Sequence, residues 1–124
     1  MIDFDNGEVL KLRPTDYGKF AKHLDQLLCG DEDPVAAFQT VRDGVVFTTK
    51  RIIAINVQGV TGTRRDFTSL PYNRIQAFSI ETAGLFDLDC ELELWFSGLG
   101  KVRFEFTGGT DAAGICRLIS QNIL

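Results

Sequence analysis

Between residues 35 and 106 apolar and polar side chains alternate with a period of two, which is the signature of β-strands. Glycine-containing turns interrupt this alternation at short intervals, so the pattern predicts a meander of antiparallel strands. The predicted strands are Val35–Val41, Val45–Thr48, Arg51–Val57, Arg65–Leu70, Arg74–Thr82, Glu91–Phe96 and Val102–Phe106. So many strands in 124 residues predict a strongly bent sandwich or a partly open barrel rather than a flat sheet.

The details of the alternation predict how individual strands are buried. The last two strands form a hairpin with one apolar face and one polar face, and Trp95 falls on the polar face. The strand Arg74–Thr82 has apolar residues on both faces, which predicts a strand covered on two sides. Asp43-Gly44 predicts a tight hairpin turn. A short alternation at the start of the chain, up to Arg13, is consistent with one further, marginal strand.

One helix is predicted on each side of the strand region. The first begins at an N-cap, Thr15, carries an apolar stripe from Tyr17 to Leu28 and ends at Gly30. Asp31–Pro34 then reads as a solvated turn. The second helix is capped by Thr110-Asp111 and closes the mouth of the barrel with its apolar face. The predicted core consists of Phe47, Ile53, Ile55, Leu92, Leu94, Phe104, Phe106, Leu118 and Ile119.

Length and composition indicate an ordinary globular domain. With 124 residues, of which 44% are hydrophobic, the chain can bury a core without help from a metal or a disulfide. We expect residues 1–34 to be an extension with one amphipathic helix and residues 35–124 to be the domain proper. No apolar run approaches the roughly 18 residues of a membrane span, and no signal peptide is recognised. Together with three cysteines that form no CxxC pair, these features favour the cytoplasm.

Charge is unevenly distributed along the chain. The net charge is −4, which argues against nucleic-acid binding, yet residues 35–75 carry six basic side chains against two acidic ones. Basic residues at strand edges and turns keep those edges soluble, and that interpretation stays open. The alternative is an anion site at Lys50, Arg51, Arg64 and Arg65, because guanidinium groups match phosphate geometry.

The sequence offers little for catalysis or metal binding. His23 is the single histidine, and it lacks the neighbours that a triad or a zinc site needs. The three cysteines read as small buried hydrophobic residues. Asp87 and Asp89 lack the remaining ligands of a calcium loop, and no glycine run forms a phosphate-binding loop. We therefore expect no enzyme activity, no cofactor and no metal.

Several motifs nevertheless resemble, in order, the bacterial pleckstrin-homology-like family. They are Phe38–Asp43, Phe47–Ile53, Gln58–Gly62, Leu70–Tyr72 with Arg74-Ile75, Phe78–Gly84, Phe86–Asp89 and Glu91–Trp95. The resemblance covers the chain from Asp33 to the C-terminus. It implies a mainly β, PH-like fold, a bent seven-stranded antiparallel barrel capped by a C-terminal helix. It also implies a homo-oligomer arranged as a ring, and it supplies no catalytic or ligand residues.

These observations lead to two functional expectations. The first is a non-enzymatic scaffold or interaction module that self-assembles and binds a protein partner, with Glu93, Trp95 and Arg103 at the interface between subunits. Glu93 and Arg103 offer opposite charges for pairing across subunits. Trp95 has a second interpretation, in which the N-terminal helix covers it. The second expectation is a peripheral membrane module that holds anionic lipid head groups on the basic residues.

Overall fold

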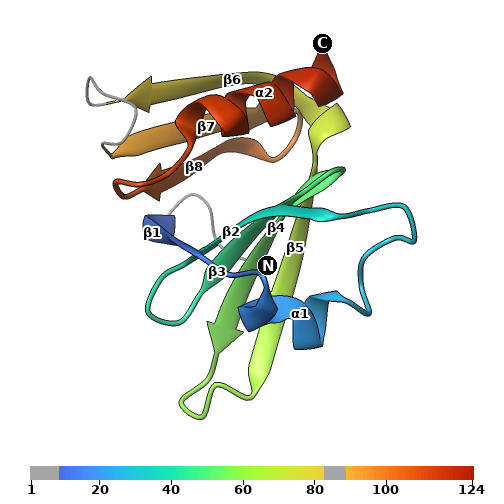
Figure 1. The fold of residues 1–124 in the computed structure, drawn as a ribbon, viewed down its shortest axis with the longest axis vertical. Coiled ribbons are helices and arrows are strands. Elements are labelled where there is room, and N and C mark those ends of the chain that lie inside the picture. The colour runs from blue at the N-terminus through green and yellow to red at the C-terminus, as the bar shows by residue number, and fades with distance from the viewer. Residues whose placement is uncertain (1–8, 83–88) are drawn as a thin grey trace.

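The computed structural model describes residues 9–82 and 89–124 (Figure 1). Asp87, the motif residues 83–88 and the first eight residues lie outside these ranges. The strands are β1 Val9–Thr15, β2 Pro34–Gln39, β3 Gly44–Thr48, β4 Arg51–Gln58, β5 Arg64–Pro71, β6 Ile75–Thr82, β7 Cys90–Phe96 and β8 Gly100–Phe106. The helices are α1 Gly18–Leu24, a 3-10 turn η1 Tyr72–Arg74, and α2 Ala112–Ile123.

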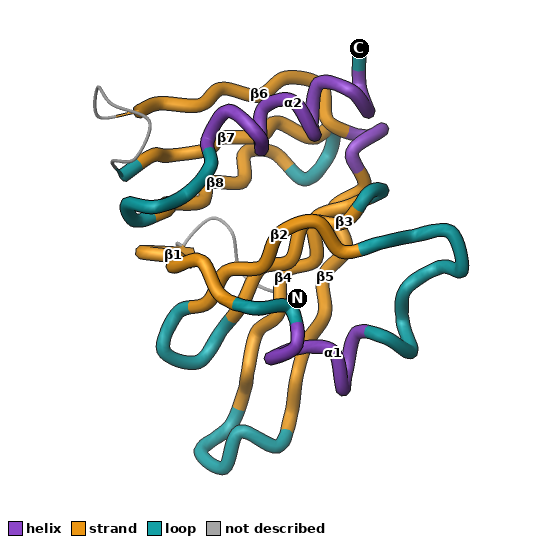
Figure 2. Tube along the Cα trace, in the orientation of Figure 1, coloured by secondary structure: helices purple, strands orange, loops and turns teal. Residues whose placement is uncertain are grey.

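The strands form one bent sheet in the order β5-β4-β3-β2-β1-β8-β7-β6. It folds into two halves, with β2–β5 in one and β6–β8 in the other, and α2 lies across the second half (Figures 1 and 2). The sheet does not close, because β5 and β6 are each paired with one neighbour. The predicted fold class, a mainly β PH-like domain with a C-terminal helix and an N-terminal helix, is confirmed.

The marginal strand at the start of the chain is a full member of this sheet. β1 pairs antiparallel with β2, where Arg13 lies opposite Gln39, and parallel with β8, where Leu12 lies opposite Phe106. The Leu12 side chain is fully buried, and the Thr107 N–H donates to the Leu12 carbonyl over 2.9 Å. β1 therefore joins the two halves of the sheet, which brings the number of strands to eight.

The main core lies between the two halves and beneath α2. Its aromatic centre is Phe38, whose ring packs edge-on against Phe47 and Phe106 with centroid distances of 5.7 and 4.7 Å. The predicted core residues are buried with one exception, Leu118, which is half-buried at the rim, whereas Ile119 is fully buried. The face of α2 that points into the core is thus centred on Ile115 and Ile119 rather than on Leu118.

A second apolar cluster lies on the other face of β2–β5, under α1. It consists of Leu24, Ala37, Val46, Ile53 and Ile55, with Tyr17, Phe20, Leu28 and Phe67 packed around them. All five residues of β3 are buried because α1 covers one face and the main core covers the other. The expectation that Arg74–Thr82 is covered on both sides was wrong: β6 is an edge strand and mostly exposed.

The first helix is shorter than its apolar stripe predicts. Thr15 is not an N-cap, since it ends β1 and lies opposite Ala37 in the sheet. The helix spans seven residues and ends at Leu24, well before Gly30. The chain then continues in turns, and the Leu27 carbonyl accepts a hydrogen bond of 3.0 Å from Arg51 Nη2 instead of from a further helical turn. Leu27 is consequently 48% exposed.

The hairpin between β2 and β3 is present, but its turn is wider than the Asp43-Gly44 signal predicts. Gln39 lies opposite Gly44, so residues 40–43 form a four-residue loop. The Asp43 N–H donates to Thr40 Oγ1 and the Thr40 N–H donates to the Asp43 carbonyl, both over 2.9 Å. Gly44 begins β3 and packs against the ring of Phe20.

Candidate functional site

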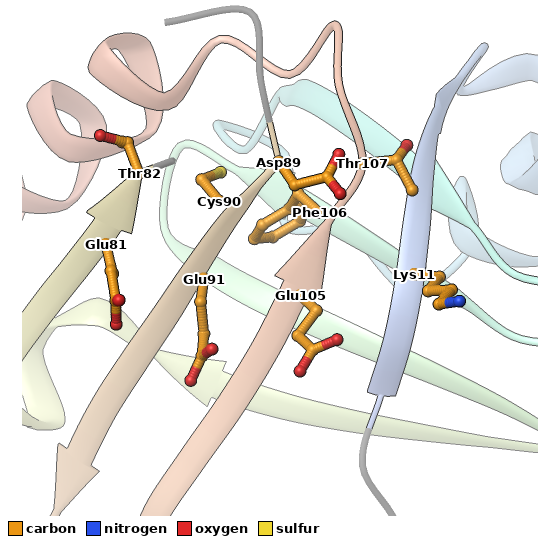
Figure 3. Close-up of a pocket in the computed structure, with 9 residues that line it drawn as sticks. All are labelled: Lys11, Glu81, Thr82, Asp89, Cys90, Glu91, Glu105, Phe106 and Thr107. Carbon is orange, nitrogen blue, oxygen red and sulfur yellow. The ribbon is translucent and has the colours of Figure 1, made fainter. Parts of the chain in front are cut away.

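The polar surface of β6, β7 and β8, here called the outer face, consists of Glu81, Glu91, Glu93, Trp95, Lys101, Arg103 and Glu105. The strand register aligns Glu81 with Glu91 and Glu91 with Glu105, so three carboxylates form a row across three strands. Figure 3 shows this row, with Lys11 of β1 beyond it. The alternation of the sequence predicted these side chains on one face of the last hairpin, and the structure brings them together.

Ion pairs within the chain organise the outer face. Arg103 Nε contacts Glu91 Oε1, and Arg103 Nη2 lies 2.6 Å from Glu105 Oε1. The hydrogen bonds from Arg103 hold the pKa of Glu91 below its ordinary value. Glu93 lies opposite Arg103 in the register, yet its carboxylate pairs with the Lys101 ammonium at 3.9 Å. Glu93 and Arg103, which we expect at the interface between subunits, are thus also engaged in ion pairs within the chain.

Trp95 is half-buried on the outer face, in register between Ala77 of β6 and Lys101 of β8. The alternative in which the N-terminal helix covers Trp95 is not what the structure shows. The side chains packed around α1 come from β2 to β5, on the other half of the sheet (Figure 1). The other sequence-based interpretation, in which a second subunit contacts Trp95, stays a prediction.

The four basic residues singled out from the sequence do not form one patch. In the β4–β5 hairpin Arg51 lies opposite Pro71, whereas Arg64 lies opposite Gln58, so the two pairs of cations occupy opposite ends of both strands. Arg51 and Gln58 are seven positions apart along an extended strand, which corresponds to about 23 Å at roughly 3.3 Å per residue. Arg64 and Arg65 also point to opposite faces, because side chains alternate along a strand.

Lys50 and Arg51 are held by acidic residues of the preceding loop. The Lys50 ammonium lies 3.1 Å from an oxygen of the exposed Asp31 carboxylate. Arg51 donates from Nε and Nη2 to the two oxygens of Glu32, both over 2.9 Å. Arg51 Nη1 also donates to Ser69 Oγ over 2.9 Å. These cations are therefore occupied within the chain.

Glu32 was placed in a solvated turn by the sequence pattern, and this was wrong because its carboxylate is fully buried. Thr48 Oγ1 donates to Glu32 Oε2 over 2.5 Å, and the Cys29 N–H donates to Glu32 Oε1 over 3.0 Å. Burial raises the pKa of Glu32, but the hydrogen bonds from Arg51 and Thr48 outweigh burial and lower the pKa to about 2. The neighbouring Tyr72 hydroxyl donates to the Thr48 carbonyl over 2.8 Å. No sequence motif indicates this cluster, because its members are far apart along the chain.

A recess that the sequence did not reveal lies where α1 meets β4 and β5, on the face of these strands that points away from the main core. It measures about 120 Å³ and is lined by Lys19, Phe20, His23, Arg42, Ile55, Val57, Arg65 and Phe67. His23, the single histidine, is half-buried there, with its ring centroid 6.3 Å from that of Phe67. Arg65 is the one residue of the predicted anion site that lines it.

The cysteines are unpaired thiols in three different environments. Cys90 is buried and Cys116 is half-buried, as expected for small hydrophobic residues, whereas Cys29 is exposed, which corrects that expectation. Burial raises the pKa values of the Cys90 and Cys116 thiols. Across residues 9–82 and 89–124 no three acidic, histidine or cysteine side chains are grouped as metal ligands would be. The helices in these ranges are too short or too polar to cross a bilayer.

An open, strongly bent and mostly antiparallel sheet with a C-terminal helix over it defines a PH-like domain. The chain belongs to the bacterial PH domain family, whose model matches residues 3–123. The match includes the N-terminal strand and helix, which lie outside the stretch that carried the sequence resemblance. The family predicted from the sequence motifs is thus confirmed.

Comparisons with individual proteins agree. The chain is 38% identical to a protein with a pleckstrin-homology domain from Shewanella loihica PV-4, whose crystal structure matches 95% of this chain and all of that one with a TM-score of 0.77. The pleckstrin-homology domain from Shewanella amazonensis SB2B is 42% identical, with 96% and 93% of the two chains covered and a TM-score of 0.64. In Bacillus subtilis strain 168, the uncharacterized protein YjqA is 51% identical over 77 residues, which span 62% of each chain.

Proposed function

We propose that the protein is a non-enzymatic interaction module of the cytoplasm that assembles with copies of itself into a ring and binds a protein partner. The observation that carries this proposal is the outer face, where a half-buried tryptophan lies amid paired charges on β7, next to the exposed edge strand β6. Tryptophan is enriched at the centres of protein interfaces, and its desolvation there is strongly favourable.

The open sheet gives a second argument. Within residues 9–82 and 89–124, β5 and β6 each pair with one neighbouring strand, so the other edge of each offers N–H and C=O groups to a further strand. The two edges belong to different strands, so a contact that uses both is heterologous, and such contacts form rings when the rotation closes.

The experiment is light scattering coupled to size exclusion at micromolar concentrations. The wild-type protein is expected to show a multiple of the 13.8 kDa chain mass, and Trp95→Ala is expected to shift the mass toward smaller species. Reversing the charge of Arg103 is expected to act in the same direction, but it also removes the pairs with Glu91 and Glu105, so circular dichroism must first show that the variant is folded. Arg117→Glu, at an exposed position on α2, is the matched control.

A monomer mass for the wild-type protein would refute self-assembly. A large mass that neither Trp95→Ala nor the Arg103 variant changes would refute the outer face as the interface. The arrangement gives less support to the membrane alternative, because Lys50 and Arg51 are occupied by Asp31 and Glu32 and lie far from Arg64 and Arg65. Flotation with anionic vesicles at two salt concentrations tests that alternative directly, since electrostatic lipid binding fades with salt.

A further inference from the structure

The recess under α1 combines a basic rim with an apolar floor. Lys19 and His23 come from α1, Arg42 from the β2–β3 loop and Arg65 from β5, so three separate segments supply basic side chains to one opening. The floor is formed by Phe20, Ile55, Val57 and Phe67. No aspartate or glutamate is among the residues that line it in the described part of the chain.

The cations at the rim are held in place without being neutralised by the groups that hold them. Lys19 Nζ donates to the amide oxygen of Gln39, and Arg42 Nη2 donates to the Gly59 carbonyl over 2.6 Å. Both acceptors are uncharged, so neither hydrogen bond places an opposite charge against the cation. Asp43 neighbours Arg42 in the loop, but its carboxylate accepts the Val57 N–H over 2.9 Å.

The floor determines what kind of anion fits. A sugar or inositol ring placed against phenylalanine, isoleucine and valine side chains loses hydrogen bonds to water without gaining protein partners, which is costly. An aromatic or branched aliphatic group instead buries apolar surface there and is stabilised by doing so. Size agrees, because an apolar cavity of about 150 Å³ accepts benzene, and this recess of about 120 Å³ is open on one side.

We propose that this recess binds a small organic anion, in which a carboxylate or phosphate group is attached to a single aromatic ring or to a short branched apolar group. The anionic group lies at the rim beside Lys19, Arg42 and Arg65, and the apolar group lies on the floor. Guanidinium and ammonium groups form charge-assisted hydrogen bonds with such anions. This assignment is independent of self-assembly through the outer face, which is on the other half of the sheet.

Phenyl phosphate and benzoate are suitable probes, with inorganic phosphate and vesicles containing phosphatidic acid as comparisons. Titration of the full chain, followed by amide chemical shifts in NMR, is expected to show saturable binding of phenyl phosphate with shifts centred on residues of α1, β4 and β5. Inorganic phosphate is expected to bind at least tenfold more weakly, because it leaves the apolar floor empty.

Two pairs of variants separate the parts of the site. Arg65→Gln is expected to weaken phenyl phosphate binding about tenfold, whereas Arg64→Gln, one residue away on the other face of β5, leaves it unchanged. Val57→Thr keeps the shape of the floor but makes it polar. It is expected to weaken phenyl phosphate several-fold while the weak binding of inorganic phosphate stays the same.

Specific results would overturn the proposal. One is that neither probe shows saturable binding up to 10 mM, which would mean a binding free energy weaker than roughly −3 kcal/mol. Another is that Arg65→Gln and Arg64→Gln weaken binding equally. Inorganic phosphate binding as tightly as phenyl phosphate would remove the role of the floor. Binding to phosphatidic acid vesicles without binding of phenyl phosphate would assign the cations to a lipid surface instead.

Discussion

Arg51 and Glu32 form a bidentate ion pair in which the carboxylate is completely buried and both N···O distances are 2.9 Å. The pair fastens the loop between α1 and β2 to the start of β4. The same guanidinium also binds the Leu27 carbonyl, so it holds both ends of that loop. Removing either partner leaves a charge without its counterpart in a low-dielectric environment, which is strongly unfavourable.

Stability should therefore fall in acid over a defined range of pH. The pKa of Glu32 lies at about 2 in the folded chain, below its ordinary value of 4.5, so protons bind the unfolded chain first as the pH falls. The lowered pKa of Glu32 contributes on the order of 3 kcal/mol to the free energy of unfolding at neutral pH. This contribution is complete above pH 5 and is lost progressively between about pH 5 and pH 2. Urea unfolding at a series of pH values measures this slope.

Glu32→Gln is the control, because glutamine keeps the shape of the side chain but does not titrate. The variant should be less stable at neutral pH and show a flatter dependence in acid. Some slope remains, since the pKa values of Asp31 and Glu91 are also lowered by their cationic partners. An unchanged slope in Glu32→Gln would contradict the assignment.

Arg51→Lys tests whether the planar fork matters beyond its charge. Lysine offers one ammonium where arginine reaches Glu32, Ser69 and the Leu27 carbonyl at once. We expect a loss of about 1–3 kcal/mol in the free energy of unfolding. Lys50→Arg, at the neighbouring exposed site, should change it by less than about 0.5 kcal/mol. Equal effects of the two substitutions would show that geometry at residue 51 is unimportant.

Gly44→Ala should be destabilising although Gly44 has an ordinary backbone conformation. A β-carbon there would lie 2.5 Å from Cζ of Phe20, so the aromatic ring of α1 must move. Overpacking of this kind costs about 1–3 kcal/mol. Adding Phe20→Leu should restore part of the loss, and a double-mutant cycle by chemical denaturation measures the coupling. Additive effects would mean that the two residues do not meet.

Ile119→Ala and Leu118→Ala compare adjacent positions on α2. Ile119 is fully buried, so Ile119→Ala should lower the free energy of unfolding by about 2–5 kcal/mol. Leu118 is half-buried at the rim, so Leu118→Ala should lower the free energy of unfolding by markedly less. Thermal and urea unfolding rank the two variants, and the reverse order would mean that α2 is rotated about its axis relative to this structure.

The strands were predictable where the environment is simple. On β7 and β8 one face meets the core and the other meets solvent, so the alternation of Leu92 and Leu94 with Glu91 and Glu93 is legible. The strand β3 was predicted as well, but the alternation does not show that both of its faces are buried, which happens because α1 covers Val46. The covering predicted for both faces of β6 was wrong, because this exposed edge strand still carries apolar residues. In both cases the deciding factor is a neighbour that the local sequence does not contain.

The candidate sites were predictable only where their residues lie on one face of a single hairpin. Trp95, Glu93 and Arg103 share the predicted face because register follows directly from alternation. The pairing of Arg51 with Glu32 spans 19 residues of chain and depends on the three-dimensional path of a loop. The recess under α1 was hidden for the same reason, since its basic residues come from segments that the fold alone brings together.

The position of β1 has a consequence for how the chain folds. β1 precedes the other strands along the chain, yet one of its two partners, β8, is the last strand of the sheet to be synthesised. The Leu12–Thr107 contact closes a loop of 95 residues. Such long-range pairing slows folding because loop closure must precede the stabilising contacts. During translation, at about 5–20 residues per second, β1 spends several seconds with one side unpaired, and chaperones that bind exposed strands have that interval in which to act.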